Sequence, residues 1–224
     1  MYDHDGEGLG GLVEKLLDAL GDGMRLRLSS MEPDHVDERL LDTLIDHRMQ
    51  PHFHIPIQSA SAKVLERASR RYSIEHVEHI IERMREAKDD PFIACDVIAG
   101  LPGEGEREFM ETYDFLDRNG FAAMHVFPYS PRPGTPLYGA RDRAEERVRD
   151  ERAEKLRELS ARHSREYIMR QAGKRLEILV ENGSEGTTGN YLKGSVLLPD
   201  GKVPVRGMIY EGVMTSTNPI IITV

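Results

Sequence analysis

Strand-like segments alternate with helical segments through roughly the first 130 residues, and this alternation limits the possible folds more than any other feature of the sequence. Apolar residues alternate or run together in 24–30, 52–57, 92–100 and 121–127. Helical spacing occurs in 9–21, 34–48, 61–70, 74–88 and about 105–118. Such an order implies parallel strands joined by helical crossovers. We therefore predict an α/β fold built on a parallel sheet or barrel.

Some local details follow from the same segments. Asp34 and Ser73 precede helical segments and are expected to cap them. FIACDVIAG (92–100) is apolar except for Asp96, as expected for a strand that is covered on both faces. A buried carboxylate is rarely left without a partner, so Asp96 is expected either to bond a neighbouring loop or to belong to a functional site.

Each of the four strand-like segments is followed by residues rich in Gly, Pro, Ser or carboxylate. The carboxyl ends of parallel strands meet at one edge, where ligands bind in open sheets and in barrels. We therefore expect these four segments to converge on a single ligand site. They are SSMEP (29–33), QSAS (58–61), GLPGE (100–104) and the rigid proline loop PYSPRPGTP (128–136).

The candidate ligand residues in these segments also have structural interpretations. Glu32 suits an ammonium group or ribose hydroxyls, but it also stabilises a helix that begins after Pro33. Gln58 and Ser59 suit ribose hydroxyls or an amino-acid group, whereas Ser61 is equally a helix cap. GLPGE is either a tight turn or a helix N-terminus that accepts a polar group.

His52 and His54 lie two residues apart and point to the same face of a strand, which is a geometry that can bind a metal. The alternative is a polar strand end with hydrogen-bonded histidines. No third ligand has a clear position in the sequence, so we predict no metal site.

The last third of the chain has a different texture. Residues 141–171 form a long, highly charged segment with a thin apolar stripe, which predicts a surface helix packed along one edge. After Gly173, short strand-like runs are separated by Asn-Gly and Pro-Asp-Gly turns, which favours a small antiparallel β-barrel. We therefore divide the chain into 1–140, a connecting helix at 141–172 and a barrel at 173–224.

Cations of the predicted barrel lie near Tyr191 and Tyr210 in the sequence. Such cations and aromatic rings hold RNA through phosphate contacts and base stacking. An ordinary barrel surface is the alternative. The candidate RNA-binding cations are Lys174, Arg175, Lys193 and Arg206.

Composition excludes several classes of protein. The net charge of −9 argues against a general nucleic-acid coat, and no apolar run is long enough to cross a membrane. Cys95 is the only cysteine, so no internal disulfide forms and the expected compartment is the reducing cytoplasm. One cysteine also cannot supply the three or four thiolates of a [4Fe–4S] cluster.

Four long motifs together resemble a known family. RLRLSSMEP, HFHIPIQSASAKVLERASRRY, DVIAGLPGEGEREFMETYDFL and HVFPYSPRPGTPLYGAR are similar, in order and spacing, to the radical SAM methylthiotransferases. The tail from Gly173 resembles the TRAM domain that ends these enzymes. The versions RLSSMEP and HVFPYSPRPGTP most resemble the branch that acts on threonylcarbamoyladenosine at position 37, in the anticodon region of tRNA. The resemblance implies a partial parallel (βα) barrel with four of six strands, S-adenosylmethionine and a [4Fe–4S] cluster.

The resemblance also implies positions for the ligands. Residues from all four strand ends would surround S-adenosylmethionine, and the proline loop, with Arg132, would lie over the reacting centre near the RNA. The residues implied for the cofactor are Ser30, Glu32, Gln58, Ser59, Asp96, Gly100, Pro102, Gly103 and Tyr129.

The sequence departs from the family pattern at the cluster. The cysteine-bearing N-terminal domain and the CxxxCxxC segment of the family have no counterpart, and YDHDG (2–6) resembles the end of the second barrel strand. We therefore expect a C-terminal part whose partner is the N-terminal domain of a parent enzyme, with no catalytic residue assigned and no methylthiolation by this chain alone. The alternatives are an isopentenyladenosine or ribosomal-protein substrate, a tRNA-binding module without catalysis, or an unrelated hydrolase or transferase that uses the histidine pair and Asp96.

Overall fold

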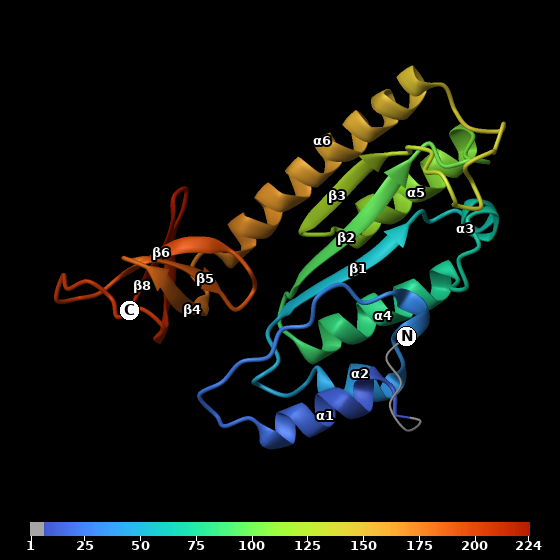
Figure 1. The fold of residues 1–224 in the computed structure, drawn as a ribbon. Helices are drawn as coiled ribbons and strands as arrows, with labels where there is room; N and C mark the ends of the chain where they lie inside the picture. The colour runs from blue at the N-terminus through green and yellow to red at the C-terminus, as the bar shows by residue number, and fades with distance from the viewer. Residues whose placement is uncertain (1–6) are drawn as a thin grey trace.

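Three parallel strands form the sheet of the N-terminal part, in the order β1 (His52–Gln58), β2 (Phe92–Ala99) and β3 (Ala123–Pro128) (Figure 1). The computed structural model describes residues 7–224, so the resemblance of YDHDG to a strand end lies outside the described residues. The prediction of a parallel α/β sheet is confirmed, and the strands at 52–57, 92–100 and 121–127 are found within about two residues of their expected ends.

The fourth predicted strand, 24–30, is wrong. Among residues 7–224 it makes a single isolated bridge, between Leu26 and Met49, which runs parallel and lies before the start of β1. The Leu26 amide donates to the Arg48 carbonyl and the Leu26 carbonyl accepts from the Gln50 amide, each at 2.8 Å. The next bond along the segment runs from the Met31 amide to the His54 carbonyl at 2.9 Å. A ladder needs such bonds at every second residue, and two anchor points five residues apart do not make a strand.

The helices lie in one layer behind the sheet (Figure 1). Apolar residues of β1 and β2, such as Ile55 and Val97, pack there against α4 and α5 to form the main core. The helices and the one 3₁₀ turn of this part are α1 (Leu9–Ala19), η1 (Pro33–His35), α2 (Glu38–Thr43), α3 (Ala62–Arg67), α4 (Ile74–Ala87) and α5 (Glu106–Asn119).

One cap prediction is confirmed and the other is wrong. Ser73 caps α4 by accepting from the His76 amide at 3.2 Å. The cap of α2 is Asp37, whose carboxylate accepts from the Leu40 amide at 2.8 Å, because Asp34 lies inside the 3₁₀ turn that follows Glu32. Helix α2 is consequently much shorter than the predicted 34–48.

Helix α6 (Glu146–Gln171) is long and packs along β3 and β2. Its buried side chains include Ala153, Leu156 and Leu159, which join the main core. The remaining faces are charged, in agreement with the predicted thin apolar stripe.

A closed five-stranded barrel follows α6 (Figure 1). Its strands are β4 (Arg175–Asn182), β5 (Glu185–Thr188), β6 (Lys193–Leu197), β7 (Ile209–Thr217) and β8 (Ile220–Thr223). The barrel is mixed rather than fully antiparallel, because β6 and β8 pair in parallel to close it. Its own small core contains Ile178, Val180, Val196, Met214 and Ile222.

A buried polar network joins the barrel to α6 and to the turn before β2. The Asn190 amide donates to the Tyr167 hydroxyl at 2.9 Å and to the Gln171 side chain at 3.1 Å. The Tyr167 hydroxyl and the Gln171 amide in turn donate to Asp90. Burial raises the pKa of Tyr167, so its hydroxyl stays protonated and keeps donating.

No helix within residues 7–224 is both long and apolar enough to cross a bilayer.

Candidate functional site

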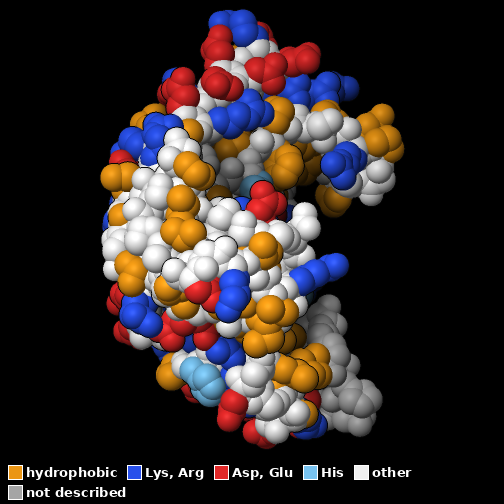
Figure 2. Space-filling view, turned by 90° about the vertical axis from the view of Figure 1, so that its left-hand side faces the viewer, with side chains coloured by type: hydrophobic (Ala, Val, Ile, Leu, Met, Phe, Trp, Pro, Cys, Tyr) orange, Lys and Arg blue, Asp and Glu red, His pale blue; other side chains and the backbone are white. Residues whose placement is uncertain are grey.

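The face of the sheet away from the helices is open. Strand side chains alternate between the two faces, so the residues that flank the core positions of β1, β2 and β3 all point to this side. The prediction that β2 is covered on both faces is therefore wrong, since Asp96 and Ile98 are only half-buried. Seen with the barrel toward the viewer, the molecule is hollowed on one side (Figure 2). The residues of the open face include His52, His54, Phe92, Asp96, Ile98, Ala123, His125 and Phe127.

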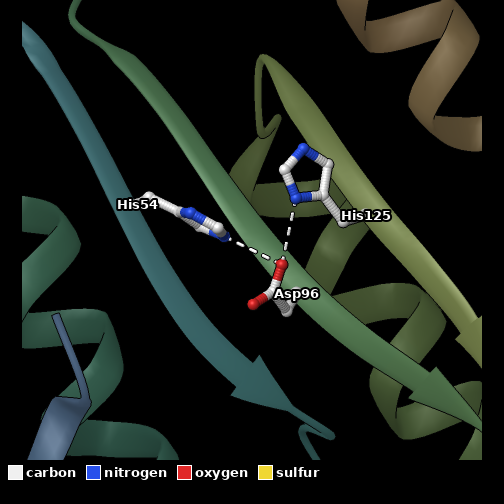
Figure 3. Close-up of side chains that lie close together, drawn as sticks. All are labelled: His54, Asp96 and His125. Atoms are coloured by element: carbon white, nitrogen blue, oxygen red, sulfur yellow. Dashed lines mark hydrogen bonds and ion pairs between the residues drawn. The ribbon is translucent and has the colours of Figure 1, made fainter. Parts of the chain in front are cut away.

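Three of these side chains converge at the middle of the sheet (Figure 3). One carboxylate oxygen of Asp96 lies 2.9 Å from the Nε2 of His54 on β1 and 3.1 Å from the Nδ1 of His125 on β3. Ser30 adds a fourth member, because its hydroxyl lies 2.9 Å from the Nδ1 of His54. Asp96 thus has the partners that its place in an apolar strand demanded, and these come from neighbouring strands rather than from a loop.

A cation and aromatic rings lie beside this cluster, where the barrel meets the sheet. The Arg27 guanidinium lies 4.6 Å from the centre of the Tyr191 ring. The His52 ring stacks on Phe92 and lies tilted against Tyr191, with ring centres 4.3 Å apart. A pocket of about 340 Å³ extends from Tyr191 to His54 and His125. The site is therefore a polar and aromatic pocket shared by the sheet and the barrel.

The electrostatics of this pocket are unusual. Among residues 7–224 Arg27 has no ion-pair partner; one guanidinium nitrogen donates to the carbonyls of Thr188 and Gly189, each at 3.2 Å, and another is buried without a hydrogen-bond partner. Burial lowers the pKa of Arg27 from its usual value. Burial, with the nearby Arg27 charge, lowers the pKa of His52 to about 4, so its imidazole is neutral at pH 7. Tyr191 has a φ of +68°, a strained value that presents its half-exposed ring to the pocket.

The strand ends lie next to one another, as predicted, but several of their residues serve the fold. Gln58 pairs in register with Val97, and the Tyr129 amide donates to the Ala99 carbonyl at 2.8 Å. Ser59 is fully buried and bonds Thr112 of α5 at 3.1 Å. Gln58 itself is half-buried, and it has a left-handed φ of +58°.

The loop after β2 is held by charged groups. Gly100 donates its amide to the Glu104 carboxylate at 2.8 Å, and Glu104 forms a buried ion pair with Arg152 of α6 at 2.9 Å. Arg149, one turn earlier on α6, covers Gly100 and donates to the Tyr129 carbonyl. Pro102 is buried and Gly103 donates to the Asp142 carbonyl.

The remaining predicted ligand residues are more scattered. Glu32 pairs with Arg70 at 3.0 Å and stays partly exposed. The Tyr129 ring is buried and its hydroxyl donates to Leu137, which fixes the proline loop, while Arg132 lies exposed on that loop. Among the residues predicted for the cofactor, Ser30 and Asp96 both contact His54 on the open face.

The predicted barrel cations do not form one patch. Lys174 pairs with Asp89 at the junction, and Arg175 pairs with Glu211 at 2.8 Å on the barrel. Lys193 pairs with Glu181 at 3.1 Å and lines a second pocket, of about 350 Å³, together with Arg27 and Tyr191. Arg206 is exposed in the segment between β6 and β7.

The sequence interpretation missed His125, Arg27 and Arg149. A signal existed for two of them. The alternation RLRL places Arg25 and Arg27 on one side of the segment. His125 is two residues from both Ala123 and Phe127, so the three share the open face of β3. Arg149 gave no signal, because it belongs to a uniformly charged stretch.

The chain's own residues do not fit an iron–sulfur cluster. Cys95 is fully buried on the helix side of β2, and burial raises the pKa of its thiol far above the usual value. A buried, protonated thiol is inert toward metals. No step through a cluster is therefore derived from these residues.

Comparisons with known proteins agree with the fold. The Radical SAM superfamily model matches residues 4–116, half of the chain. A solved structure, the radical SAM enzyme coproporphyrinogen III oxidase from Escherichia coli, superposes with a TM-score of 0.55 over 69% of this chain and 36% of its own, at 15% identity. This likeness concerns the fold alone.

Two curated relatives carry a more specific likeness. The chain is 37% identical over 179 residues to "Threonylcarbamoyladenosine tRNA methylthiotransferase MtaB" of Bacillus subtilis, which covers 75% of this chain and 40% of that protein. It is 35% identical over 182 residues to "tRNA-2-methylthio-N(6)-dimethylallyladenosine synthase" of Cereibacter sphaeroides, covering 80% of this chain and 41% of that protein. The chain thus spans about two fifths of the length of these relatives. It belongs to the radical SAM superfamily, and the curated proteins to which it is similar are tRNA methylthiotransferases.

Proposed function

We propose that this chain is the sheet-and-barrel part of a methylthiotransferase that adds a methylthio group to C2 of threonylcarbamoyladenosine at position 37 of tRNA. The observation that carries the proposal is the 37% identity to the Bacillus subtilis enzyme over three quarters of the chain. The open, polar face of a parallel sheet supports it, because ligands of such folds bind where strands leave one face and one edge uncovered. The cytoplasm, where tRNA is found, is the compartment that fits.

S-adenosylmethionine, the cofactor of the superfamily, supplies the radical chemistry when it is bound. Ser30, Glu32 and Gln58 would hold its hydroxyl and amino-acid groups, because these side chains are at least partly exposed near the strand ends. Gly100 leaves space for an adenine ring only when the Arg149 side chain moves away. The cluster ligands are assigned to the two cysteine-bearing parts of the parent enzyme, its N-terminal domain and its CxxxCxxC segment, since the one thiol of this chain is buried.

The pocket at Tyr191 is the proposed approach for the RNA. An exposed aromatic ring beside a guanidinium that has no carboxylate partner in the described part of the chain is suited to stack a base and to attract a phosphate. Tyr191 belongs to the barrel, whereas His54 belongs to the sheet, so a nucleotide that stacks on the ring also reaches the open face. This arrangement gives the barrel, which resembles a TRAM domain, a role in presenting the anticodon region.

A chimaera tests the proposal. This chain replaces the matching segment of the Bacillus subtilis relative in cells that lack that enzyme, and tRNA nucleosides are identified by mass spectrometry. We expect methylthio-threonylcarbamoyladenosine. Methylthiolation of dimethylallyladenosine instead would assign the chain to the other branch. A soluble, cluster-loaded chimaera that binds tRNA and modifies neither base would leave the second candidate, a tRNA-binding module without catalysis.

A further inference from the structure

We propose that His54, Asp96 and His125 form a site for one divalent transition-metal ion on the open face of the sheet, separate from any iron–sulfur cluster. Each residue comes from a different strand, and each offers one ligand atom to the same point (Figure 3). The proposal does not depend on the proposed function, because it concerns only side chains of this chain.

The spacing of the ligand atoms fits a metal ion. All three atoms lie within 4.8 Å of one another, and the Asp96 oxygen is 2.9 Å and 3.1 Å from the two imidazole nitrogens. Ligands at about 2.1 Å from an ion are separated by roughly 3.0 Å in an octahedral site and 3.4 Å in a tetrahedral one. The two distances to Asp96 match these separations, and the two imidazole nitrogens, which lie within 4.8 Å of each other, reach them by side-chain rotation.

The backbone holds this spacing in place. β1, β2 and β3 are directly paired, and Asp96 lies in register with His125 on the neighbouring strand. Metal sites on paired strands are more rigid than sites on loops, because the main-chain hydrogen bonds fix the distance between ligand positions.

The donor set selects the class of metal. Two imidazoles and one carboxylate suit Zn²⁺, Fe²⁺ and Co²⁺, whereas Mg²⁺ and Ca²⁺ prefer oxygen ligands alone. Three protein ligands leave open positions on the ion. A pocket of about 340 Å³, which His54 and His125 line, lies beside the three ligands and offers room for a further ligand.

Ser30 supplies the support that a ligating histidine usually has. A metal-bound imidazole commonly bonds through its second nitrogen to a neighbouring oxygen, which fixes the tautomer and the ring. The Ser30 hydroxyl lies 2.9 Å from the Nδ1 of His54. In the metal-free protein these contacts fit Nε2–H donating to Asp96 while the Ser30 hydroxyl donates to Nδ1, and when an ion binds Nε2 the proton moves to Nδ1, which then donates to Ser30.

The test is titration of the metal-free 224-residue protein with Co²⁺, followed by visible absorption, and with Zn²⁺, followed by calorimetry. We expect one ion per chain. Asp96→Asn and His125→Gln should weaken binding at least 10-fold, and Ser30→Ala roughly 10-fold, as for lost outer-shell partners. The matched control is His47→Gln, which removes an exposed imidazole outside the proposed ligand set and should leave the affinity unchanged.

Two results would overturn the site. One is that the unaltered protein shows no saturable metal binding, and the other is that Asp96→Asn and His125→Gln bind the metal as tightly as the unaltered protein. His125 is more than half exposed, so its variant is expected to fold, and unfolding curves confirm this for each variant. The readout needs neither S-adenosylmethionine nor tRNA, so its failure is distinguishable from failure of the methylthiotransferase assignment.

Discussion

Arg149 lies directly over Gly100, so that a Cβ atom added to Gly100 would come within 2.2 Å of the Arg149 Cγ. Gly100 also has a left-handed φ of +77°. Gly100→Ala should therefore lower the free energy of unfolding by about 2–4 kcal/mol, from backbone strain and overpacking together. Urea unfolding measures this. The double variant Gly100→Ala with Arg149→Ala should recover only the part of the lost unfolding free energy that comes from overpacking. A Gly100→Ala variant that is as stable as the native protein would contradict this geometry.

Removal of the Arg149 side chain alone should open the end of β2. In the proposed function an adenine ring lies near Gly100, and Arg149 occupies that space. Arg149→Ala is therefore expected to bind S-adenosylmethionine several-fold more tightly in equilibrium dialysis. The control is Arg147→Ala, on the same helix, where the side chain is exposed and pairs only with Glu151. Equal binding by both variants would argue against this place for the adenine.

The buried pair of Glu104 and Arg152 should make stability depend on pH when its cation is removed. Burial raises the pKa of Glu104, so the folded protein holds that proton more tightly than the unfolded chain. Stability then falls as pH rises through the window between the two pKa values, and more so without Arg152. We expect Arg152→Met to lose about 3–5 kcal/mol at pH 7.5 and less at pH 5.

Urea unfolding at the two pH values measures this difference. Glu104→Gln in the Arg152→Met background should restore part of the loss, because it removes the unpaired charge. A loss that is the same at both pH values would show that the carboxylate is not responsible.

His52 should destabilise the fold as the solution becomes acidic. Its pKa is about 4 in the folded protein, against 6.5 in the unfolded chain, so protons bind preferentially to the unfolded state. The stability is complete above pH 6.5 and is lost as pH falls toward 4, by about 2 kcal/mol between pH 7 and 5. His52→Gln should remove this part of the acid dependence in denaturant titrations, while His47→Gln should keep it.

Tyr191 should matter for RNA and not for folding. Glycine accepts a φ of +68° without strain, so Tyr191→Gly is expected to fold, but it loses the ring. With the proposed tRNA ligand, we expect affinity to fall roughly 5- to 100-fold in fluorescence anisotropy, since a stacked base contributes about 1–3 kcal/mol. Tyr191→Phe should bind normally. Binding by Tyr191→Gly at native strength would remove Tyr191 from the RNA site.

The sequence predicts well what depends on local pattern. Strands β1, β2 and β3 are apolar runs between helical segments, and α4 begins at the Ser73 cap that its sequence indicates. The segment 24–30 has the same alternation, but a strand exists only where a neighbour bonds at every second residue, and that depends on the path of another segment.

The candidate site depends on longer-range geometry. His125 becomes a partner of Asp96 only through the register of two strands 29 residues apart. Arg149 lies almost 50 residues after Gly100 in the sequence, on another element. The local sequence around either residue does not predict their contact. Of the predicted ligand residues, Asp96 reaches the open face because its position on β2 fixes the direction of its side chain, whereas Ser30 reaches His54 from a segment that is not a strand.

The network of Asn190, Tyr167, Gln171 and Asp90 ties three separate stretches of chain into one joint. Each polar side chain in this network has a hydrogen-bond partner. A rotation of the barrel relative to the sheet would break several of these buried hydrogen bonds at once. The gap between Tyr191 and His54 is consequently set when the protein folds. A molecule bound at Tyr191 on the barrel therefore lies at a fixed distance from His54 on the sheet.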